Sequence, residues 1–275
     1  MLIIKKIKNR GKRVMSYVRG EHVDRKARPV KKLTRILAKN SGRMKTGKIS
    51  VRHRGGGTRR KYRIIDFKQR EGEFTIERIE RDPNRKCFIA LVRIEGGEQA
   101  YLLATTSMKP GDIVSAGAEV ELKEGNRTLL GRIPTGSIVC NIEMTPGAGG
   151  QIARSGGSGA VVMGCEKGMV QLKMPSGEVR LVPEACFATI GQMSNPENSA
   201  VRIGKAGRMR KMGRRPQVRG KAMNPVDHPH GGGEGNQPIG LKHPKTKWGR
   251  PALGVRTRNK EKKSSKYILK RRSKN

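Results

Sequence analysis

Short apolar runs that alternate with polar positions fill residues 60–114 of the chain. A period of two predicts β-strands, because successive side chains of a strand point to opposite faces of a sheet. The run 87–92 is apolar at every position, which is typical of a central strand covered on both faces. Turn-forming sequences at 82–84 and 95–97 separate the runs. We expect about five short strands within about 70 residues, the spacing of a small β-barrel.

A second set of alternating runs follows residue 126 and continues to residue 190. Ile138, Cys140 and Ile142 occupy every second position, and a Pro-Ser-Gly turn stands at 175–177. We expect four or five further strands over about 65 residues and a second small β-barrel. A glycine-rich stretch at 147–159 has no core of its own to bury, which predicts a long loop that is either mobile or ordered by a ligand.

The two ends of the chain lack the alternating pattern. Residues 1–20 are basic and are expected to be irregular, while apolar positions at helical spacing predict a short basic helix over 29–39. Residues 199–275, the C-terminal tail, have too few large apolar side chains to form a core. We therefore expect the tail to be largely disordered by itself and to become ordered when it binds folded RNA. The prediction is a mainly β protein in four parts: a basic N-terminal extension 1–44, barrels at 45–124 and 125–198, and a basic extended tail 199–275.

Charge changes this picture from a generic β protein to one that binds a polyanion. The formal net charge is +39, from 61 Lys and Arg against 22 Asp and Glu. Residues 1–70 carry +22, residues 71–198 carry −3 and residues 199–275 carry +20. A nearly neutral body between two basic arms indicates nucleic acid as the partner. Solvated tails are the alternative reading of charge runs, but glycine and proline motifs interrupt both arms.

Several other classes are disfavoured. No apolar run approaches the roughly 20 residues of a membrane-spanning helix. No secretory signal is apparent either, because the apolar start gives way to charge at Lys5. The four cysteines contain no C-x-x-C pair, so neither a zinc site nor a disulfide framework is predicted, and each is expected to be a buried free thiol in a reducing compartment, at positions 87, 140, 165 and 186.

A basic segment leads into three successive glycines, Gly55, Gly56 and Gly57. Guanidinium groups bind phosphate oxygens, and a backbone without side chains allows close approach. No G-K-[ST] sequence follows, so the segment is not a P-loop. We expect phosphate contacts here, and a tight turn before a strand is a compatible structural role.

Residues 223–236, here called the Pro-Gly loop, have no apolar periodicity. Pro225 and Pro229 fix the backbone of its first half, while Gly231, Gly232 and Gly233 leave three successive positions of its second half without side chains. Such a segment suits a stiff loop threaded against a bulky partner outside the chain.

Acid-base catalysis or a metal site is the alternative role for this loop. His228 and His230, with Asp227 and Glu234, supply the chemical groups, and the more distant His243 is a further candidate. The sequence pairs no nucleophile with them and surrounds them with no hydrophobic pocket. We therefore predict no enzymatic activity, no metal site and no cofactor.

The Pro-Gly loop and six other motifs resemble the universal large-subunit ribosomal protein family numbered two, in its bacterial and organellar form. The motifs follow one another in order along most of the chain, at 52–57, 62–68, 82–85, 149–155, 175–178, 223–235 and 271–274. So many motifs in sequence are far more specific than a lone glycine-rich box.

This resemblance implies an oligonucleotide-binding-type barrel followed by a Src-homology-three-like barrel; the pattern alone allowed other small barrels. It also implies a structural role in the large subunit: assembly, subunit association, transfer-RNA binding and support of the RNA near the peptidyl-transferase centre. The expected partners are large-subunit ribosomal RNA, other ribosomal proteins and the small subunit across a bridge, with no membrane and no small-molecule substrate. The expected RNA-binding residues are Lys45, Lys48, Arg52, His53, Arg54, Gly55, Gly56, Gly57, Arg59, Arg60, Lys61, Arg63, Arg154, Arg202, Lys205, Arg208, Arg210, Lys211, Arg214, Arg215, Arg219, Asn224, Asp227, His228, His230, Gly231, Gly232, Gly233, Trp248, Arg271 and Arg272.

A free RNA chaperone or an architectural nucleic-acid-binding protein is the alternative function. It would share the positive charge, but it would not need a long, stiff loop of defined sequence. The absence of a transit-peptide pattern at residues 1–3 favours a bacterial cytoplasmic ribosome over an organellar one.

Overall fold

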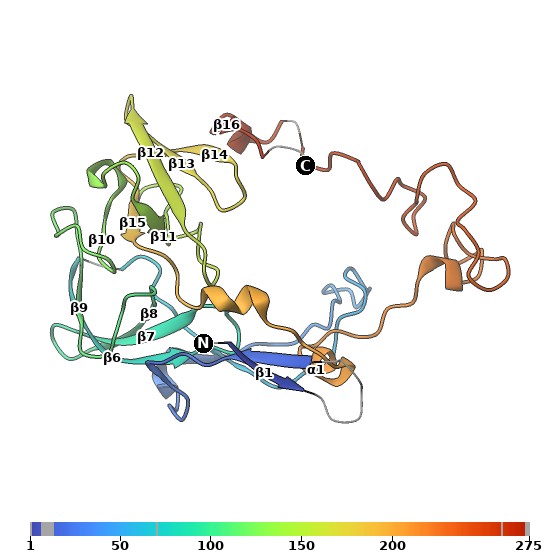
Figure 1. The fold of residues 1–275 in the computed structure, drawn as a ribbon, viewed down its shortest axis with the longest axis horizontal. Coiled ribbons are helices and arrows are strands. Elements are labelled where there is room, and N and C mark those ends of the chain that lie inside the picture. Colours follow the sequence, from blue (N-terminus) through green and yellow to red (C-terminus); the bar gives the residue numbers. More distant parts are fainter. Residues whose placement is uncertain (1, 7–13, 70, 260, 273–275) are drawn as a thin grey trace. The chain divides into compact units, whose positions relative to one another are not determined.

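The computed structural model describes residues 2–6, 14–69, 71–259 and 261–272, and it forms two compact units (Figure 1). The barrel unit comprises Met1–Ala38, Arg59–Lys205 and Lys266–Asn275. The loop unit comprises Lys39–Thr58 and Ala206–Ser265. The four-part division at residues 44, 124 and 198 remains a prediction.

The first barrel contains an antiparallel ladder in the order β8, β7, β6, β9, with β3 parallel to β6. Its inward side chains, among them Phe74, Ile76 and Leu102, form one buried apolar cluster. The strands expected in this region are confirmed from residue 72 onward. Their bounds are β3 (Val23–Asp24), β6 (Gly72–Arg81), β7 (Phe88–Ile94), β8 (Gln99–Leu103) and β9 (Ile113–Ala116).

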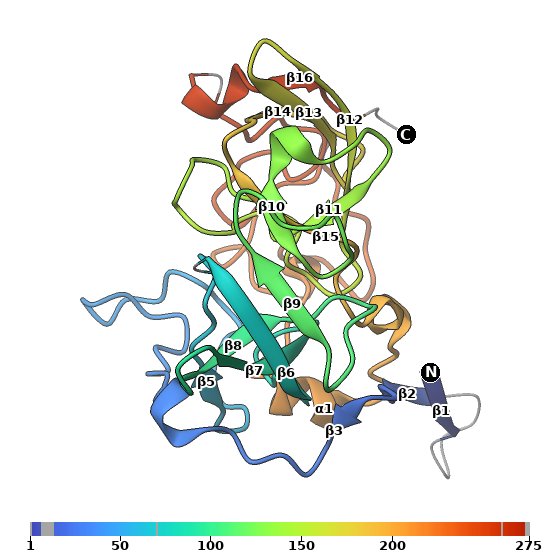
Figure 2. The same ribbon diagram turned by 90° about the vertical axis from the view of Figure 1, so that its left-hand side faces the viewer.

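The second barrel follows the order β16, β14, β13, β12, β11, β15, β10 (Figure 2). Val139, Leu172 and Val182 belong to its buried cluster. The last strand comes from the C-terminal tail and pairs with β14, so the tail contributes to a sheet that the sequence pattern did not assign to it. The bounds are β10 (Arg127–Leu129), η2 (Leu130–Arg132), β11 (Ile138–Cys140), β12 (Ala160–Glu166), β13 (Met169–Lys173), β14 (Val179–Pro183), β15 (Phe187–Ile190) and β16 (Ile268–Lys270).

A third apolar cluster joins the two barrels. It packs Ile89, Leu91 and Tyr101 of the first barrel against Cys140 and Met193. The two ladders also meet where β9 and β10 pair in parallel through a single residue pair. The barrels therefore fold as one unit because they share buried apolar surface.

The cysteines are free thiols, and three of them are buried, as expected. Cys165 is exposed, which corrects the expectation for that residue. A register shift between Val162 and Gly164 breaks the alternation of β12, and the strand runs out of the core beyond it.

The N-terminal region differs from its prediction. Within the stretch expected to be irregular, β1 (Leu2–Lys6) and β2 (Val14–Val18) form an antiparallel pair. The helix expected over 29–39 is only the short η1 (Lys31–Leu33), followed by β4 (Thr34–Ile36), which pairs with β5 (Lys61–Arg63).

Tertiary contacts explain the missing helix. The Val30 amide donates to the Tyr101 hydroxyl at 3.2 Å, and the Leu33 carbonyl accepts the Ile64 amide at 2.9 Å. These backbone groups bond to the barrel rather than to a helical turn. Ile36 and Leu37 are left exposed, so the apolar positions do not form one buried face.

The glycine-rich loop at 147–159 is ordered from inside the protein. The buried Glu143 carboxylate accepts the amides of Gly147 at 3.1 Å and Gly149 at 3.0 Å. Arg127 Nη2 donates to the same carboxylate at 3.1 Å, and Gly150 donates to the Phe67 carbonyl at 2.9 Å. The expectation of a mobile or ligand-ordered loop is corrected, because an internal carboxylate takes the place of a bound anion.

The loop unit has little regular structure. None of the fully buried apolar side chains among the described residues belongs to it. Its helical segments are α1 (Ala206–Lys211), η4 (Gly220–Ala222) and η5 (Lys263–Ser265), while η3 (Pro196–Ala200) belongs to the barrel unit. No helix in the described part of the chain has the length and apolar character needed to span a membrane.

Candidate nucleic-acid interface

Two segments far apart in the sequence cross in the loop unit, at residues 52–58 and 209–217. Arg54 and Arg214 form an antiparallel bridge. The amides of Gly55 and Thr58 donate to the carbonyls of Gly213 and Lys211, at 3.0 and 2.9 Å. We call this arrangement the backbone crossing. It brings the triple-glycine motif and the arginine-rich start of the tail into one structure.

His53 fixes one side of the backbone crossing. Its backbone has φ 59°, and its carbonyl accepts the Arg215 amide at 3.0 Å. Its Nδ1 lies 2.9 Å from the Pro216 carbonyl oxygen. A carbonyl only accepts, so Nδ1 carries the proton. His53 therefore holds neighbouring arginines in place through its own hydrogen bonds.

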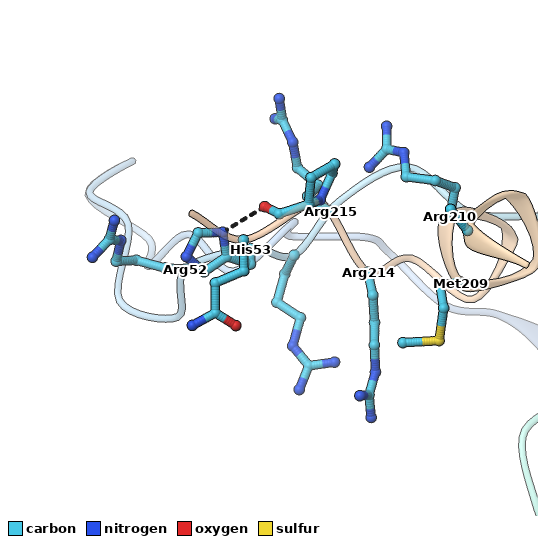
Figure 3. A pocket seen from close by; sticks show the side chains of 10 residues that line it. Arg52, His53, Met209, Arg210, Arg214 and Arg215 are labelled. Atoms are coloured by element: carbon cyan, nitrogen blue, oxygen red, sulfur yellow. Dashed lines mark hydrogen bonds between the residues drawn. The ribbon is translucent and has the colours of Figure 1, made fainter. Parts of the chain in front are cut away.

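Five exposed arginines surround the backbone crossing and line a pocket of about 650 Å³ (Figure 3). In Figure 3 the side chains of Arg210 and Arg214 point to opposite sides of the backbone. Among the described residues, no carboxylate forms an ion pair with any of the five guanidinium groups. We call these residues the arginine pocket: Arg52, Arg54, Arg210, Arg214 and Arg215.

The uncompensated charge extends beyond the pocket. The sequence of the loop unit contains 22 Lys and Arg and only Asp227, Glu234 and Glu261 as acids, a net charge of +19. Like charges at this density repel one another unless a polyanion neutralises them. The arrangement can therefore bind several phosphates at once, with arginine forks matched to their oxygens.

The three glycines of the motif differ in what surrounds them. A Cβ on Gly57 would lie 2.8 Å from the Gly213 nitrogen, so this glycine permits the backbone crossing itself. A Cβ on Gly56 would meet only Arg210 Nη2, at 4.0 Å. The expected close approach of a phosphate thus suits Gly56, while Gly57 is required by packing within the chain.

The Pro-Gly loop is braced by its own backbone. The Asn224 carbonyl accepts the amides of Asp227 and His228 at 3.0 and 3.2 Å. The Met223 carbonyl accepts the Gly232 amide at 3.1 Å. A Cβ on Gly231 would lie 2.3 Å from the Asn224 oxygen, so the closed turn needs glycine there. Asn224 and Asp227 remain exposed at the turn.

The two loop histidines lie close together and are half-buried. Their ring centroids are 4.7 Å apart. The described residues contain no group of three or more His, Cys, Asp or Glu placed to hold a metal ion. The geometry brings His228 and His230 together but gives the pair no third ligand.

Arg63 has partners different from those of the other predicted RNA-binding residues. It is buried, with its guanidinium 4.0 Å from Glu80 and 3.9 Å from Asp82. Glu80 is buried too, and it accepts the Tyr101 hydroxyl at 3.1 Å and Arg78 Nε at 2.9 Å. Arg63 is thus occupied inside the first barrel, and we leave it out of the interface proposed below.

Arg154 is exposed and lies on an aromatic ring. Its guanidinium carbon is 4.5 Å from the Phe67 centroid, and Nη1 donates to the Gly150 carbonyl at 2.9 Å. Trp248 is 72% exposed with Lys247 Nζ 4.8 Å from its ring. Both groups present a flat face on which a base can stack.

The remaining predicted residues are distributed over both units. Arg208 and the glycines Gly231 and Gly232 are half-buried, Gly233 is exposed, and the Arg60 guanidinium donates to the Pro83 carbonyl at 2.9 Å. Ser273 and Lys274, part of the C-terminal basic motif, lie outside the described residues. The others are exposed: Lys45, Lys48, Arg59, Lys61, Arg202, Lys205, Lys211, Arg219, Arg271 and Arg272.

Sequence reasoning missed two lysines that tie loops together. Lys39 Nζ donates to the carbonyls of Gly57 and Thr58 at 3.0 and 3.1 Å. Lys221 Nζ lies 3.4 Å from the Asn236 carbonyl oxygen. Both lysines stand in basic runs, and nothing in their spacing distinguishes them from solvated charges.

Two family models match the chain in tandem. Residues 30–116 match "Ribosomal Proteins L2, RNA binding N-terminal domain", and residues 123–249 match "Ribosomal Proteins L2, C-terminal domain". The chain belongs to the ribosomal protein L2 family. This family membership confirms the resemblance carried by the sequence motifs.

Curated relatives in this family are similar over nearly their whole length. Large ribosomal subunit protein uL2 of Ruegeria sp. (strain TM1040) is 54% identical over 249 residues, which is 90% of this chain and 89% of the relative. The uL2 proteins of Roseobacter denitrificans and Rhodospirillum centenum are 53% and 51% identical. They cover 89% and 91% of their own lengths and 90% of this chain.

Proposed function

We propose that this chain is a structural constituent of the large ribosomal subunit and binds large-subunit ribosomal RNA. Its membership in the L2 family supports the role, and the arginine pocket is the observation that carries the chemistry. Five guanidinium groups with no carboxylate partner in the described part of the chain gather around one backbone crossing. In folded RNA, phosphates from neighbouring strands supply the missing negative charge.

The two units have different tasks in this proposal. The barrel unit is a folded body that docks on RNA through exposed basic residues such as Arg59, Arg60 and Lys61. The loop unit extends between RNA helices, where the arginine pocket binds phosphates and Trp248 stacks on a base. Arg154 of the barrel unit stacks on another base. We further propose that the four parts predicted from the sequence are the functional parts of the protein.

The finer roles follow from the same placement. We propose that the chain supports subunit assembly, association with the small subunit, transfer-RNA binding and peptide-bond formation by shaping RNA near the peptidyl-transferase centre. It does so without chemistry of its own, in the cytoplasmic ribosomes of a bacterium. Bacterial relatives at 51 to 54% identity support that location.

Sedimentation of cell lysates through a sucrose gradient tests the proposal. We expect the chain in the large-subunit peak before and after a high-salt wash, because arms threaded through folded RNA dissociate slowly. Release to the top of the gradient would contradict it and favour a free RNA chaperone or an architectural nucleic-acid-binding protein.

Paired arginine substitutions then test the pocket. In the full chain, Arg214→Ala with Arg215→Ala removes two guanidinium groups, while Lys167→Ala with Lys173→Ala removes equal charge from exposed positions of the second barrel. The binding constant for large-subunit RNA is measured at several salt concentrations, and its logarithm is plotted against the logarithm of salt concentration. We expect the arginine pair to make the slope of this plot shallower by about 0.7 to 0.9 per lost phosphate contact. The lysine pair is expected to change this slope less. Equal changes would mean that the pocket has no special role.

A further inference from the structure

The Pro-Gly loop uses its two histidines as hydrogen-bond acceptors. The His230 backbone amide donates to Nδ1 of His228 at 3.0 Å. The Lys245 backbone amide donates to Nε2 of His230 at 2.8 Å. A backbone amide can only donate, so each of these two ring nitrogens must carry a lone pair.

The accepting nitrogens fix the tautomer of each ring. A neutral imidazole has one lone pair and one N–H, on opposite nitrogens. His228 must therefore be protonated at Nε2, and His230 at Nδ1. The two neighbouring histidines hold opposite tautomers, and both are neutral.

Close packing prevents the His228 ring from turning out of this arrangement. A Cβ on Gly220 would lie 2.5 to 2.7 Å from three atoms of that ring. The His230 ring lies against it, with the centroids 4.7 Å apart. The bond from Lys245 also ties the loop to the segment that follows it, where Lys245 bridges to Pro251.

We propose that this histidine pair is a tautomer lock that presents two N–H donors to RNA. The donors are Nε2–H of His228 and Nδ1–H of His230, and no protein acceptor for either is found among the described residues. They suit acceptor oxygens of RNA: phosphate, ribose or base carbonyl. The inference rests on the proposed function, because it names what the loop recognises in that RNA.

The same geometry assigns the histidines a positioning and binding role. The lone pair that a general base needs is already used within the loop on both rings. Taking a proton there would break the bond to the His230 or Lys245 amide. The lock therefore holds the loop in shape for RNA and leaves the rings as donors.

The tautomers are measured first, in the full chain without RNA. Long-range proton–nitrogen NMR of the imidazoles distinguishes the two forms at neutral pH. We expect His228 protonated at Nε2 and His230 at Nδ1, with His243, which is exposed, as the internal control for a rapidly exchanging ring. Averaged or reversed tautomers at either locked position would overturn the proposal.

Asparagine and glutamine substitutions test the internal acceptor and the RNA donor of each histidine separately. Asparagine places its acceptor oxygen near the position of Nδ1, and glutamine places it near Nε2. His228→Asn and His230→Gln therefore keep the internal acceptor, while His228→Gln and His230→Asn lose it. In the chain without RNA, we expect the backbone amides of His230 and Lys245 to keep slow hydrogen exchange in the variant that retains their acceptor and to exchange faster in the variant that loses it. Because His228→Asn and His230→Gln also lose the N–H donor, they should bind large-subunit RNA about tenfold more weakly than the unchanged chain, the scale of one hydrogen bond.

The two experiments separate the lock from the proposed function. Equal hydrogen exchange of the His230 amide in His228→Asn and His228→Gln would overturn the lock even if RNA binding is strong, and unchanged RNA binding of His228→Asn would overturn the donor role. If NMR finds the two opposite tautomers but the chain does not bind large-subunit RNA selectively, the loop geometry is supported and its role as an RNA donor site is wrong.

Discussion

The arginines that lie beside acids in the barrel unit differ from those of the arginine pocket in the loop unit. In the barrel unit, Arg63, Arg78, Arg85 and Arg127 all form ion pairs with acids of the same unit. In the loop unit, the arginine pocket has no such partner among the described residues. Charge that is neutralised inside the protein stabilises or specifies the fold, whereas charge left unpaired is available to RNA.

The two units also differ in what holds them together. The barrel unit buries three apolar clusters. The loop unit depends on backbone hydrogen bonds, close glycine contacts and ring nitrogens as acceptors. Apolar burial is proportional to area and tolerates many sequences, while backbone crossings require particular residues at particular positions. Substitutions should therefore affect the two units through different mechanisms.

The largest effect is expected from the buried pair in the barrel unit. Arg127 is fully buried, donating to Glu143 at 3.1 Å and to the Asn141 carbonyl at 2.8 Å. Arg127→Met leaves the Glu143 charge buried without its partner, and we expect a loss of about 3 to 5 kcal/mol of unfolding free energy. Urea unfolding of the full chain measures it.

An exposed ion pair is the control for this comparison. Arg93 is exposed and pairs with Glu77 at 2.7 Å. Arg93→Met is expected to lower the unfolding free energy by less than about 1 kcal/mol. Similar losses for the two variants would mean that burial does not decide the strength of these pairs.

The next effect concerns a glycine of the loop unit. Gly57 and Gly47 both have positive φ, at 86° and 77°, but only Gly57 has backbone atoms in the path of a Cβ. Gly57→Ala should lower the unfolding free energy by about 1 to 3 kcal/mol more than Gly47→Ala. Both substitutions place a side chain on a left-handed backbone, and only Gly57→Ala also creates a clash. Faster amide hydrogen exchange at Gly55 and Thr58 in the first variant alone is the expected readout. Unchanged exchange there would contradict the importance of the backbone crossing.

The last effect is absent at neutral pH, where it is the smallest of the three: an alkaline destabilisation of the barrel unit. Burial, with a smaller contribution from Glu143, raises the pKa of the Cys186 thiol to about 11. Unfolding exposes a thiol with an ordinary pKa of about 8.5, so the unfolded chain releases its proton first as the pH rises. Stability is fully present below about pH 8.5 and falls toward pH 11.

Substitution of that thiol isolates its contribution. Cys186→Ala should make the unfolding free energy less dependent on pH between 8.5 and 10.5, measured by urea unfolding at matched salt. The loop unit contains no cysteine, so its amide exchange should show no matching change. The same pH dependence in Cys186→Ala and the unchanged chain would exclude this thiol as a source.

The strands could be predicted because their apolar positions repeat every second residue. The runs ending at Leu103 and Lys173 coincide closely with strands of the structure. Helical spacing at 29–39 was misleading, since hydrogen bonds to Tyr101 and Ile64 override local periodicity. The pattern also missed β16, because a three-residue strand is too short to show a period.

The candidate interface was only partly predictable. Composition indicated which residue types are expected to contact RNA, and most of the expected arginines are exposed. Arg63 looks like its neighbours in sequence, yet it lies beside Glu80 and Asp82. Those acids are 17 and 19 positions away, and no local pattern reports such a pairing.

The sequence by itself determined the class of partner, the family and the β character, since charge, motif order and alternation are properties of single residues and near neighbours. Tertiary structure alone decided which charges remain free, how Gly57 meets Gly213, and which nitrogen of each loop histidine is protonated. Those features depend on contacts between segments up to about 150 positions apart, as where Thr58 donates to Lys211. Long-range contacts of this kind are fixed by packing and hydrogen bonding in three dimensions, and local sequence carries no record of them.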